Sequence, residues 1–222
     1  MATRREAVIA IAGGKGGCGK TTTAIGVAAA LAAAGRRARV VDLDIDMPNV
    51  HRVASVDRTP TITDLNERSL AAVAHQSPKV PGVDVLTAPR HGRVPDYDRL
   101  AATLGDSMPT ILDCPCGAGP DAVAPLVMAE SVVIVLAPTH ASVQDAIKTE
   151  AMASTLGTPV GAVVIVGTRR PPAVVTAPFR SQQVQPIPAV DGDPLIVDAS
   201  TRAYRRVAET LLETTTISTR AR

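Results

Sequence analysis

The glycine-rich segment Gly14–Thr22 carries the residues whose types and spacing best fit a chemical function. It contains the pattern Gly-x4-Gly-Lys-Thr, between a short apolar run and an alanine-rich run. Glycines allow consecutive backbone N–H groups to face an anion, and a helix that begins here directs its positive end to the same place. Lys20 would reach the β- and γ-phosphates of a nucleotide, and the Thr21 hydroxyl would ligate Mg²⁺. The pattern therefore predicts a nucleoside triphosphate site.

A second lysine, Lys15, lies inside this segment, where phosphate-binding loops accept almost any residue. With it, the segment resembles the deviant phosphate loop of the ParA/MinD family of ATPases. The resemblance implies a P-loop that binds ATP through Gly14, Lys15, Gly16, Gly17, Cys18, Gly19, Lys20, Thr21 and Thr22. It also implies that Lys15 crosses a dimer interface to the partner's ATP, where it would stabilise charge on the transferred phosphoryl group as an arginine finger does.

Carboxylates follow two of the apolar runs. Asp42 and Asp44 lie at the end of the first of them, and Asp113 ends the second. Ligands of parallel α/β sheets lie at the carboxyl ends of strands, so we expect these acids beside the phosphates. The resemblance to the family's acidic motifs implies that Asp44 orients the attacking water and is catalytic together with Lys15 and Lys20. It also implies that Asp42 and Asp113 support Mg²⁺ beside Thr21.

Later segments resemble the remaining nucleotide-contacting parts of the family. The stretch that follows Asp113 resembles the second switch region, in which Gly117 would bring a backbone N–H near the γ-phosphate. Thr168 and Arg169 occupy the place where many members carry an adenine-reading asparagine, and Pro188 lies in a segment that resembles the loop against the base. The resemblance therefore adds Thr168, Arg169 and Pro188 to the expected nucleotide-binding residues.

Short Val- and Ile-rich runs alternate with alanine-rich or amphipathic stretches along the chain, which predicts an α/β fold. We expect a single doubly wound, mostly parallel sheet with helices on both faces, because the runs are almost continuously apolar. Strands are expected at Ala7–Ala12, Ala38–Leu43, Val83–Leu86, Thr110–Asp113, Val132–Ala137, Ala162–Val166 and Val184–Ile187. Helices are expected over Lys20–Ala34 and from about Asp198, and a proline-rich loop over Arg169–Gln183.

The bulk composition bounds the protein class. A chain of 222 residues with 45% hydrophobic residues predicts one α/β domain. With the resemblance, this implies a P-loop ATPase domain over residues 1–213, followed by a polar tail over residues 214–222. A net charge of +2 is too small to indicate nucleic-acid binding by itself. Because no apolar stretch is long enough for a signal peptide or a membrane span, we expect a cytoplasmic protein. The tail has no apolar stripe, so no membrane anchor is expected.

Two residue classes leave alternatives open. Cys18, Cys114 and Cys116 would lie near one another in this fold, either as a metal-holding trio or as small residues in tight loops. Arginines gather in three short clusters, which would form either a solvated face or a DNA-binding surface.

The sequence and the resemblance together predict an ATPase that hydrolyses ATP slowly with Mg²⁺ and forms an ATP-dependent sandwich homodimer. We expect this dimer to act as a switch in intracellular positioning or partitioning, with an activating protein partner. Two alternatives remain at this point: a carrier that matures a metallocluster or cofactor, and a regulatory adaptor switched by nucleotide.

Overall fold

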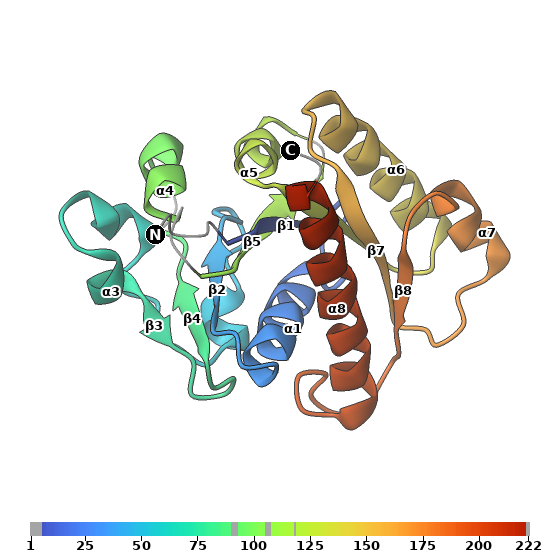
Figure 1. Cartoon of the computed structure of the whole chain (residues 1–222), viewed down its shortest axis with the longest axis horizontal. Coiled ribbons are helices and arrows are strands. Elements are labelled where there is room, and N and C mark those ends of the chain that lie inside the picture. The colour runs from blue at the N-terminus through green and yellow to red at the C-terminus, as the bar shows by residue number, and fades with distance from the viewer. Residues whose placement is uncertain (1–5, 90–92, 105–107, 118, 221–222) are drawn as a thin grey trace.

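The computed structural model describes residues 6–89, 93–104, 108–117 and 119–220, with the backbone alone over residues 214–220. Its centre is a sheet in the order β3-β4-β2-β5-β1-β6-β7-β8 (Figure 1). All neighbouring pairs in that order are parallel except β3 and β4. The strands are β1 (Val8–Gly13), β2 (Ala38–Asp42), β3 (His75–Gln76), β4 (Val83–Leu86), β5 (Thr110–Cys116), β6 (Ser131–Leu136), β7 (Val160–Val166) and β8 (Val184–Ile187).

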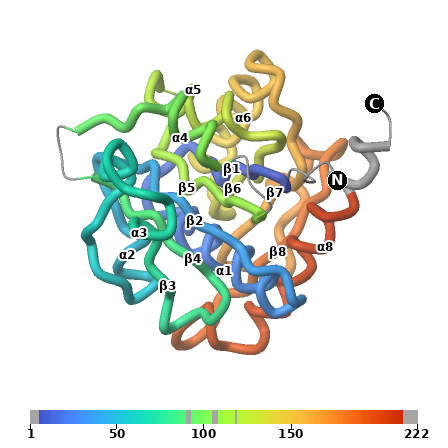
Figure 2. The backbone as a smooth tube through the Cα atoms, turned by 60° about the vertical axis from the view of Figure 1, so that its left-hand side comes forward, coloured from blue at the N-terminus to red at the C-terminus, as the bar shows by residue number. Residues whose placement is uncertain are grey.

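Helical segments connect the strands and cover both faces of the sheet. The α-helices are α1 (Lys20–Ala33), α2 (Val50–Val53), α3 (Leu70–Val73), α4 (Tyr97–Leu104), α5 (Val123–Met128), α6 (His140–Thr155), α7 (Ala173–Thr176) and α8 (Asp198–Arg220). Three 3-10 turns supplement them: η1 (Ile62–Asn66), η2 (Pro120–Ala122) and η3 (Ala177–Phe179). Figure 2 shows α5 and α6 on one side of the central strands and α1 on the other.

Two apolar cores lie on opposite faces of the sheet, because side chains alternate along a strand. In β1, Ile9 and Ile11 pack against α1 and α8, whereas Val8 and Ala10 pack toward α5 and α6. The expected doubly wound α/β architecture is therefore confirmed. The central strand β1 lies between β5 and β6. The chain passes from β1 to β2 on one side of it and later crosses from β5 to β6 on the other, so the strand order reverses at β1. Such a point opens a crevice at the carboxyl end of the strand, and the glycine-rich segment follows β1 there.

The structure differs from the sequence expectations in the C-terminal third. Residues 169–183, which the sequence predicts as a loop, contain α7 and η3, and Phe179 is completely buried. Prolines are compatible with the starts of short helices, and two apolar side chains, Val175 and Phe179, give these turns a place in the core. The backbone of α8 continues to Arg220, so most of the segment expected as a tail is helical. No helix among the described residues is long and apolar enough to span a membrane.

Candidate functional site

The glycine-rich segment forms a loop between β1 and α1, at the carboxyl edge of the sheet. Gly19 precedes the helix with φ +96°, a backbone conformation that side-chain-bearing residues rarely adopt. Gly14 lies directly against α6, since a Cβ on it would stand 2.0 Å from Cβ of Asp145. Gly16 and Gly17 are exposed and have open space around them. The loop is therefore anchored at both ends and open to solvent in its middle.

The two lysines of the loop lie in different environments. The Lys20 side chain is buried to 7% exposure, and its ammonium donates to the Lys15 carbonyl with Nζ···O 3.5 Å. It therefore lies across the inside of the loop, as a lysine that neutralises bound phosphate must. Lys15 is exposed. An exposed side chain at this position is free to reach a group outside its own chain.

Thr21 and Asp113, which the sequence predicts as metal-site residues, are in direct contact. The Thr21 hydroxyl, in the first turn of α1, donates to Oδ2 of Asp113, in the middle of β5, at 2.7 Å. The other oxygen, Oδ1 of Asp113, is buried without a hydrogen-bond partner among the described residues. A buried carboxylate oxygen without a partner is costly, so this pair is well suited to the hydration shell of a cation.

Burial also changes the protonation of these acids. Desolvation raises the pKa of Asp113 to about 7, although the Thr21 hydroxyl and the Lys20 charge oppose the shift. Desolvation raises the pKa of Asp42 well above its usual value, with a further increase from the nearby charge of Asp113. Two carboxylates that share a buried edge repel each other when both are ionised. A cation at this edge would relieve that repulsion.

Asp42 and Asp44 have different surroundings. Asp42 is fully buried, and its two oxygens accept from the backbone N–H groups of Asp44 at 3.2 Å and Val50 at 3.1 Å. Asp44 is half-buried, and its Oδ1 accepts from the Met47 N–H at 3.1 Å. Asp42 therefore closes the turn after β2, and this turn presents Asp44 at the edge of the sheet. The sequence expectation placed Asp42 at the metal, whereas here its oxygens hold the backbone that carries Asp44.

Gly117 also has a partner that the sequence does not predict. Its N–H donates to the carbonyl of Gly13 at 3.1 Å, because β5 runs beside β1 as far as Cys116. The expectation that this N–H faces a γ-phosphate is therefore not met in the described conformation. The Gly117 N–H would have to break its hydrogen bond to the Gly13 carbonyl before it could donate to a ligand. The φ of Gly117 is +91°, a backbone conformation that glycine adopts readily and other residues rarely adopt.

The residues expected near the base lie on the other side of the loop from the acids. The Thr168 N–H donates to the Ile187 carbonyl at 3.1 Å, which brings Thr168 beside the buried Pro188. Val166 contacts the position that a Cβ on Gly19 would occupy, at 3.3 Å. Arg169 is exposed, and Thr22 is half-buried on the first turn of α1. The predicted residues thus lie at or near the carboxyl ends of the parallel strands.

The cysteines do not form a common site. Cys18 is buried in the core beside α1, and Cys114 is buried in the opposite core, while Cys116 is exposed. Burial raises the pKa of both the Cys18 and the Cys114 thiol. Among the described residues, no group of three or more His, Cys, Asp or Glu side chains could hold a metal ion. The alternative of a metal-holding thiol trio is therefore not supported by the described structure, since the sheet separates Cys18 from Cys114.

The residues fit a nucleotide with Mg²⁺ even though the part of the chain that the structure describes supplies no complete metal cage. Mg²⁺ keeps several waters and is held by one or two carboxylates plus substrate phosphates. The oxygen without a partner on Asp113 and the adjoining Thr21 hydroxyl match that requirement. Gly14 and Gly19 let the loop backbone approach a phosphate, and Lys20 adds a buried cation.

Asp145 is a residue of this site that sequence reasoning missed. It lies on α6, and its Cβ packs where Gly14 has no side chain. It also forms an ion pair with Lys148 at 3.1 Å on the same helix. No sequence signal marks it, because its position follows from the packing of α6 on the loop rather than from a motif.

Comparisons with known proteins agree with this geometry. Residues 9–212 match the family described as the CobQ/CobB/MinD/ParA nucleotide binding domain. An uncharacterized ATP-binding protein of Methanocaldococcus jannaschii is 31% identical over 173 residues, covering 74% of this chain and 66% of that protein. The septum site-determining protein MinD of Synechocystis sp. is 29% identical over 152 residues, covering 63% of this chain and 56% of that protein. The matched parts therefore span less than two thirds of these relatives' own length.

A solved structure has the same fold. The septum site-determining protein MinD of Pyrococcus horikoshii, complexed with Mg-ADP, superimposes with a TM-score of 0.82 at 20% identity. The match covers 96% of this chain and 98% of that chain. This likeness extends over the whole sheet and both helical layers.

Proposed function

This chain belongs to the CobQ/CobB/MinD/ParA family of nucleotide-binding domains and is a ParA/MinD-like P-loop protein, and we propose that it is an Mg²⁺-dependent ATPase. The observation that carries the proposal is the contact between Thr21 and Asp113, with Oδ1 of Asp113 buried and without a partner. In the chain without a ligand, the buried oxygen that lacks a partner costs stability. The arrangement becomes favourable when a hydrated cation and a triphosphate occupy the edge of the sheet.

Each residue of the site has a role that its position supports. Lys20 neutralises charge on the β- and γ-phosphates from inside the loop, and Asp44 orients the attacking water. Thr21 and Asp113 would hold the cation, which when bound would neutralise the charge that develops as the phosphoryl group is transferred. Asp42 positions Asp44 through the two backbone N–H groups that it accepts. The Gly117 N–H would release the Gly13 carbonyl and donate to the γ-phosphate instead.

The exposure of Lys15 supports a dimeric mechanism. Among the described residues no acceptor pairs with the Lys15 ammonium, whereas a second copy of the chain could place its phosphates within reach of this group. We therefore propose that ATP-bound chains form a sandwich homodimer and separate after hydrolysis. The chain is similar to septum-site and partitioning proteins, so we propose that this cycle is a slow switch for positioning or partitioning in the cytoplasm. A protein partner would accelerate the hydrolysis step.

The dimeric mechanism is tested by measuring ATPase activity against protein concentration. The wild-type specific activity should rise with protein concentration, and light scattering in a slowly hydrolysed ATP analogue should show dimers. Lys15→Ala should still bind the analogue, because Lys20 and the loop remain intact. It should lose both dimerisation and turnover, because the side chain that would reach the partner's phosphates is absent. Asp44→Ala is the matched control, since it should dimerise and still fail to hydrolyse ATP. A Lys15→Ala protein that dimerises and turns over normally would remove the lysine from the mechanism.

A further inference from the structure

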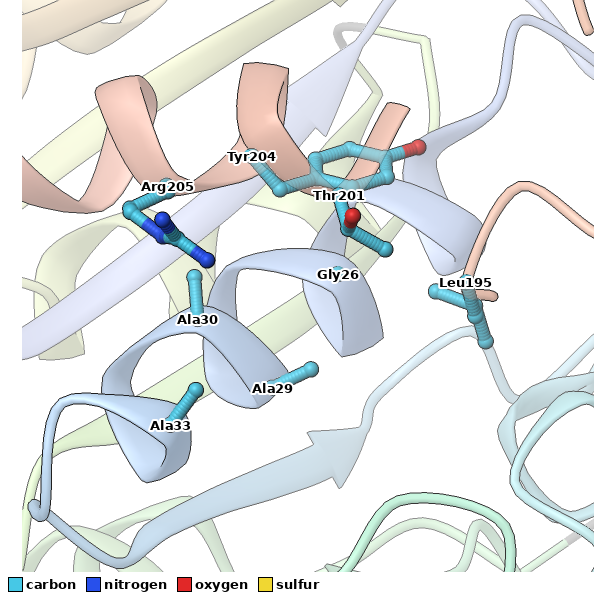
Figure 3. A pocket seen from close by; sticks show the side chains of 8 residues that line it. All are labelled: Gly26, Ala29, Ala30, Ala33, Leu195, Thr201, Tyr204 and Arg205. Carbon is cyan, nitrogen blue, oxygen red and sulfur yellow. The ribbon is translucent and has the colours of Figure 1, made fainter. Parts of the chain in front are cut away.

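A cavity of about 180 Å³ lies between α1 and α8, away from the nucleotide edge (Figure 3). Its floor is a run of small residues on α1, and its walls come from α8 and from the segment before that helix. The lining residues are Gly26, Ala29, Ala30, Ala33, Leu195, Thr201, Tyr204 and Arg205. The cavity is therefore mainly apolar, with one cation and two hydroxyl-bearing side chains.

The shape of this groove is fixed by the close contact of the two helices. A Cβ on Gly26 would stand 2.5 Å from the Tyr204 ring, so the ring lies directly on the α1 backbone. Beyond this contact, Ala29 and Ala33 are too small to fill the space beneath α8; Ala29 is half-buried and Ala33 is exposed. The groove is thus a consequence of packing and is already formed in the ligand-free chain.

One charged group overhangs the groove without a partner. The Arg205 guanidinium is directed toward Ala30 in Figure 3, and it forms no hydrogen bond or ion pair with the residues that the structure describes. Arg202, one turn earlier on α8, is paired with Asp198. At the other end of the groove, Leu195 is followed by Ile196, which is 69% exposed. An exposed apolar surface beside a cation without a counter-ion is typical of an interaction site.

The size and polarity of the groove select the kind of ligand. Cofactor pockets usually have roughly 300–1,000 Å³, so this one is too small for a nucleotide or a drug-sized molecule. A phosphate would also find few donors, because the backbone N–H groups of Ala29, Ala30 and Ala33 lie within a helix and are used there. One apolar side chain of another protein would fill the space, as buried anchor residues do at protein interfaces.

From these observations we propose that the α1–α8 groove docks an acidic segment of a partner protein that inserts one apolar side chain. The apolar side chain would lie on Ala29 and Ala33, and a neighbouring carboxylate would pair with Arg205. Charge complementarity favours an acidic segment, because Arg205 is the charged residue of the lining and has no counter-ion of its own among the described residues. This surface is independent of the proposed ATPase cycle.

The test uses the full chain and a phage-displayed library of random peptides as the probe. Enriched peptides should share an apolar residue next to Asp or Glu, and fluorescence anisotropy of labelled copies gives their affinity. Arg205→Glu should weaken binding by about tenfold or more, because the guanidinium that meets the carboxylate is reversed. Ala29→Leu should weaken it similarly by filling the groove.

Matched variants keep the test specific. Arg206→Glu reverses the next charge on α8, and Ala151→Leu adds the same side chain to an exposed position on α6; neither lines the groove. Both should leave peptide affinity unchanged, and binding of a fluorescent ATP analogue should be unchanged in every variant. If Ala29→Leu impairs folding, Ala33→Glu at the exposed end gives the same test, because it would supply Arg205 with an internal partner.

Other outcomes overturn the proposal. The proposal fails if the library yields no enriched peptide, or if the enriched peptides are basic or purely apolar. It also fails if Arg205→Glu does not change the affinity of the enriched peptides. Sedimentation with anionic lipid vesicles that depends on Arg205 would also overturn it, because a bilayer would then be the occupant. Failure of the ATPase assay would leave these results unaffected, so the two proposals can fail separately.

Discussion

The two ends of α1 illustrate two ways in which one helix can form a binding surface. Its first turn presents Lys20 and Thr21 to the edge of the sheet, after a left-handed glycine. Its later turns present Gly26, Ala29 and Ala33, whose small size leaves a groove under α8. The first surface depends on polar atoms that bind a ligand, and the second depends on side chains that are too small to fill the space between the helices. Substitutions should therefore affect the two surfaces separately.

The largest expected effect is at the first turn. Lys20→Ala should lower ATP affinity on the order of 100-fold or more, because it removes the buried cation inside the loop and no other lysine of the loop is buried there. Equilibrium binding of a labelled ATP analogue measures this. The α1–α8 groove should keep its peptide affinity in this variant. Arg206→Ala, at an exposed position on α8, is the control. Wild-type ATP affinity in Lys20→Ala would refute the assignment of the loop.

An intermediate effect is expected at the middle of the helix. Gly26→Ala should lower the free energy of unfolding by about 1–3 kcal/mol, because the new Cβ would clash with the Tyr204 ring and push α8 away. Urea unfolding followed by circular dichroism checks this. The loss should be smaller when the same substitution is made in a Tyr204→Leu background, since the ring that clashes is then absent. Equal losses in both backgrounds would show that the helices are not held at this contact.

The smallest effect concerns Asp113 in the absence of a cation. Its pKa is raised by burial to about 7 in the folded chain, from an ordinary value of 3.8. A raised acid pKa means that the folded state holds the proton more tightly, so stability is lost as the pH rises from about 4 through 7. With a chelator present, the free energy of unfolding should fall between pH 6 and pH 8 by on the order of 1–2 kcal/mol from this group.

Asp113→Asn provides the comparison for that pH dependence. The amide does not ionise, so the decrease between pH 6 and pH 8 should be smaller in this variant than in the wild type. Urea unfolding at the two pH values measures the difference. The same decrease in both proteins would mean that other groups cause it.

Much of the nucleotide site can be predicted from sequence, because its residues lie in short motifs next to strand ends. The loop, Asp44 and Asp113 all appear at the carboxyl edge where the strand pattern places them. The partners of these residues were less predictable. That Asp42 holds the backbone of Asp44, and that Gly117 donates to Gly13, depends on how far each strand runs beside its neighbour.

By itself the sequence determined the α/β class, the order of most strands and helices, and the phosphate loop, since each of these is encoded over a few consecutive residues. Only the tertiary structure decided which side chains from distant segments meet. Cys18 and Cys114 lie on opposite faces of the sheet. Residues 169–183 form short helical turns, because Phe179 packs into the core there. The tertiary structure also created the α1–α8 groove. The physical reason is that packing between distant segments depends on the volumes of both partners, which no local pattern contains.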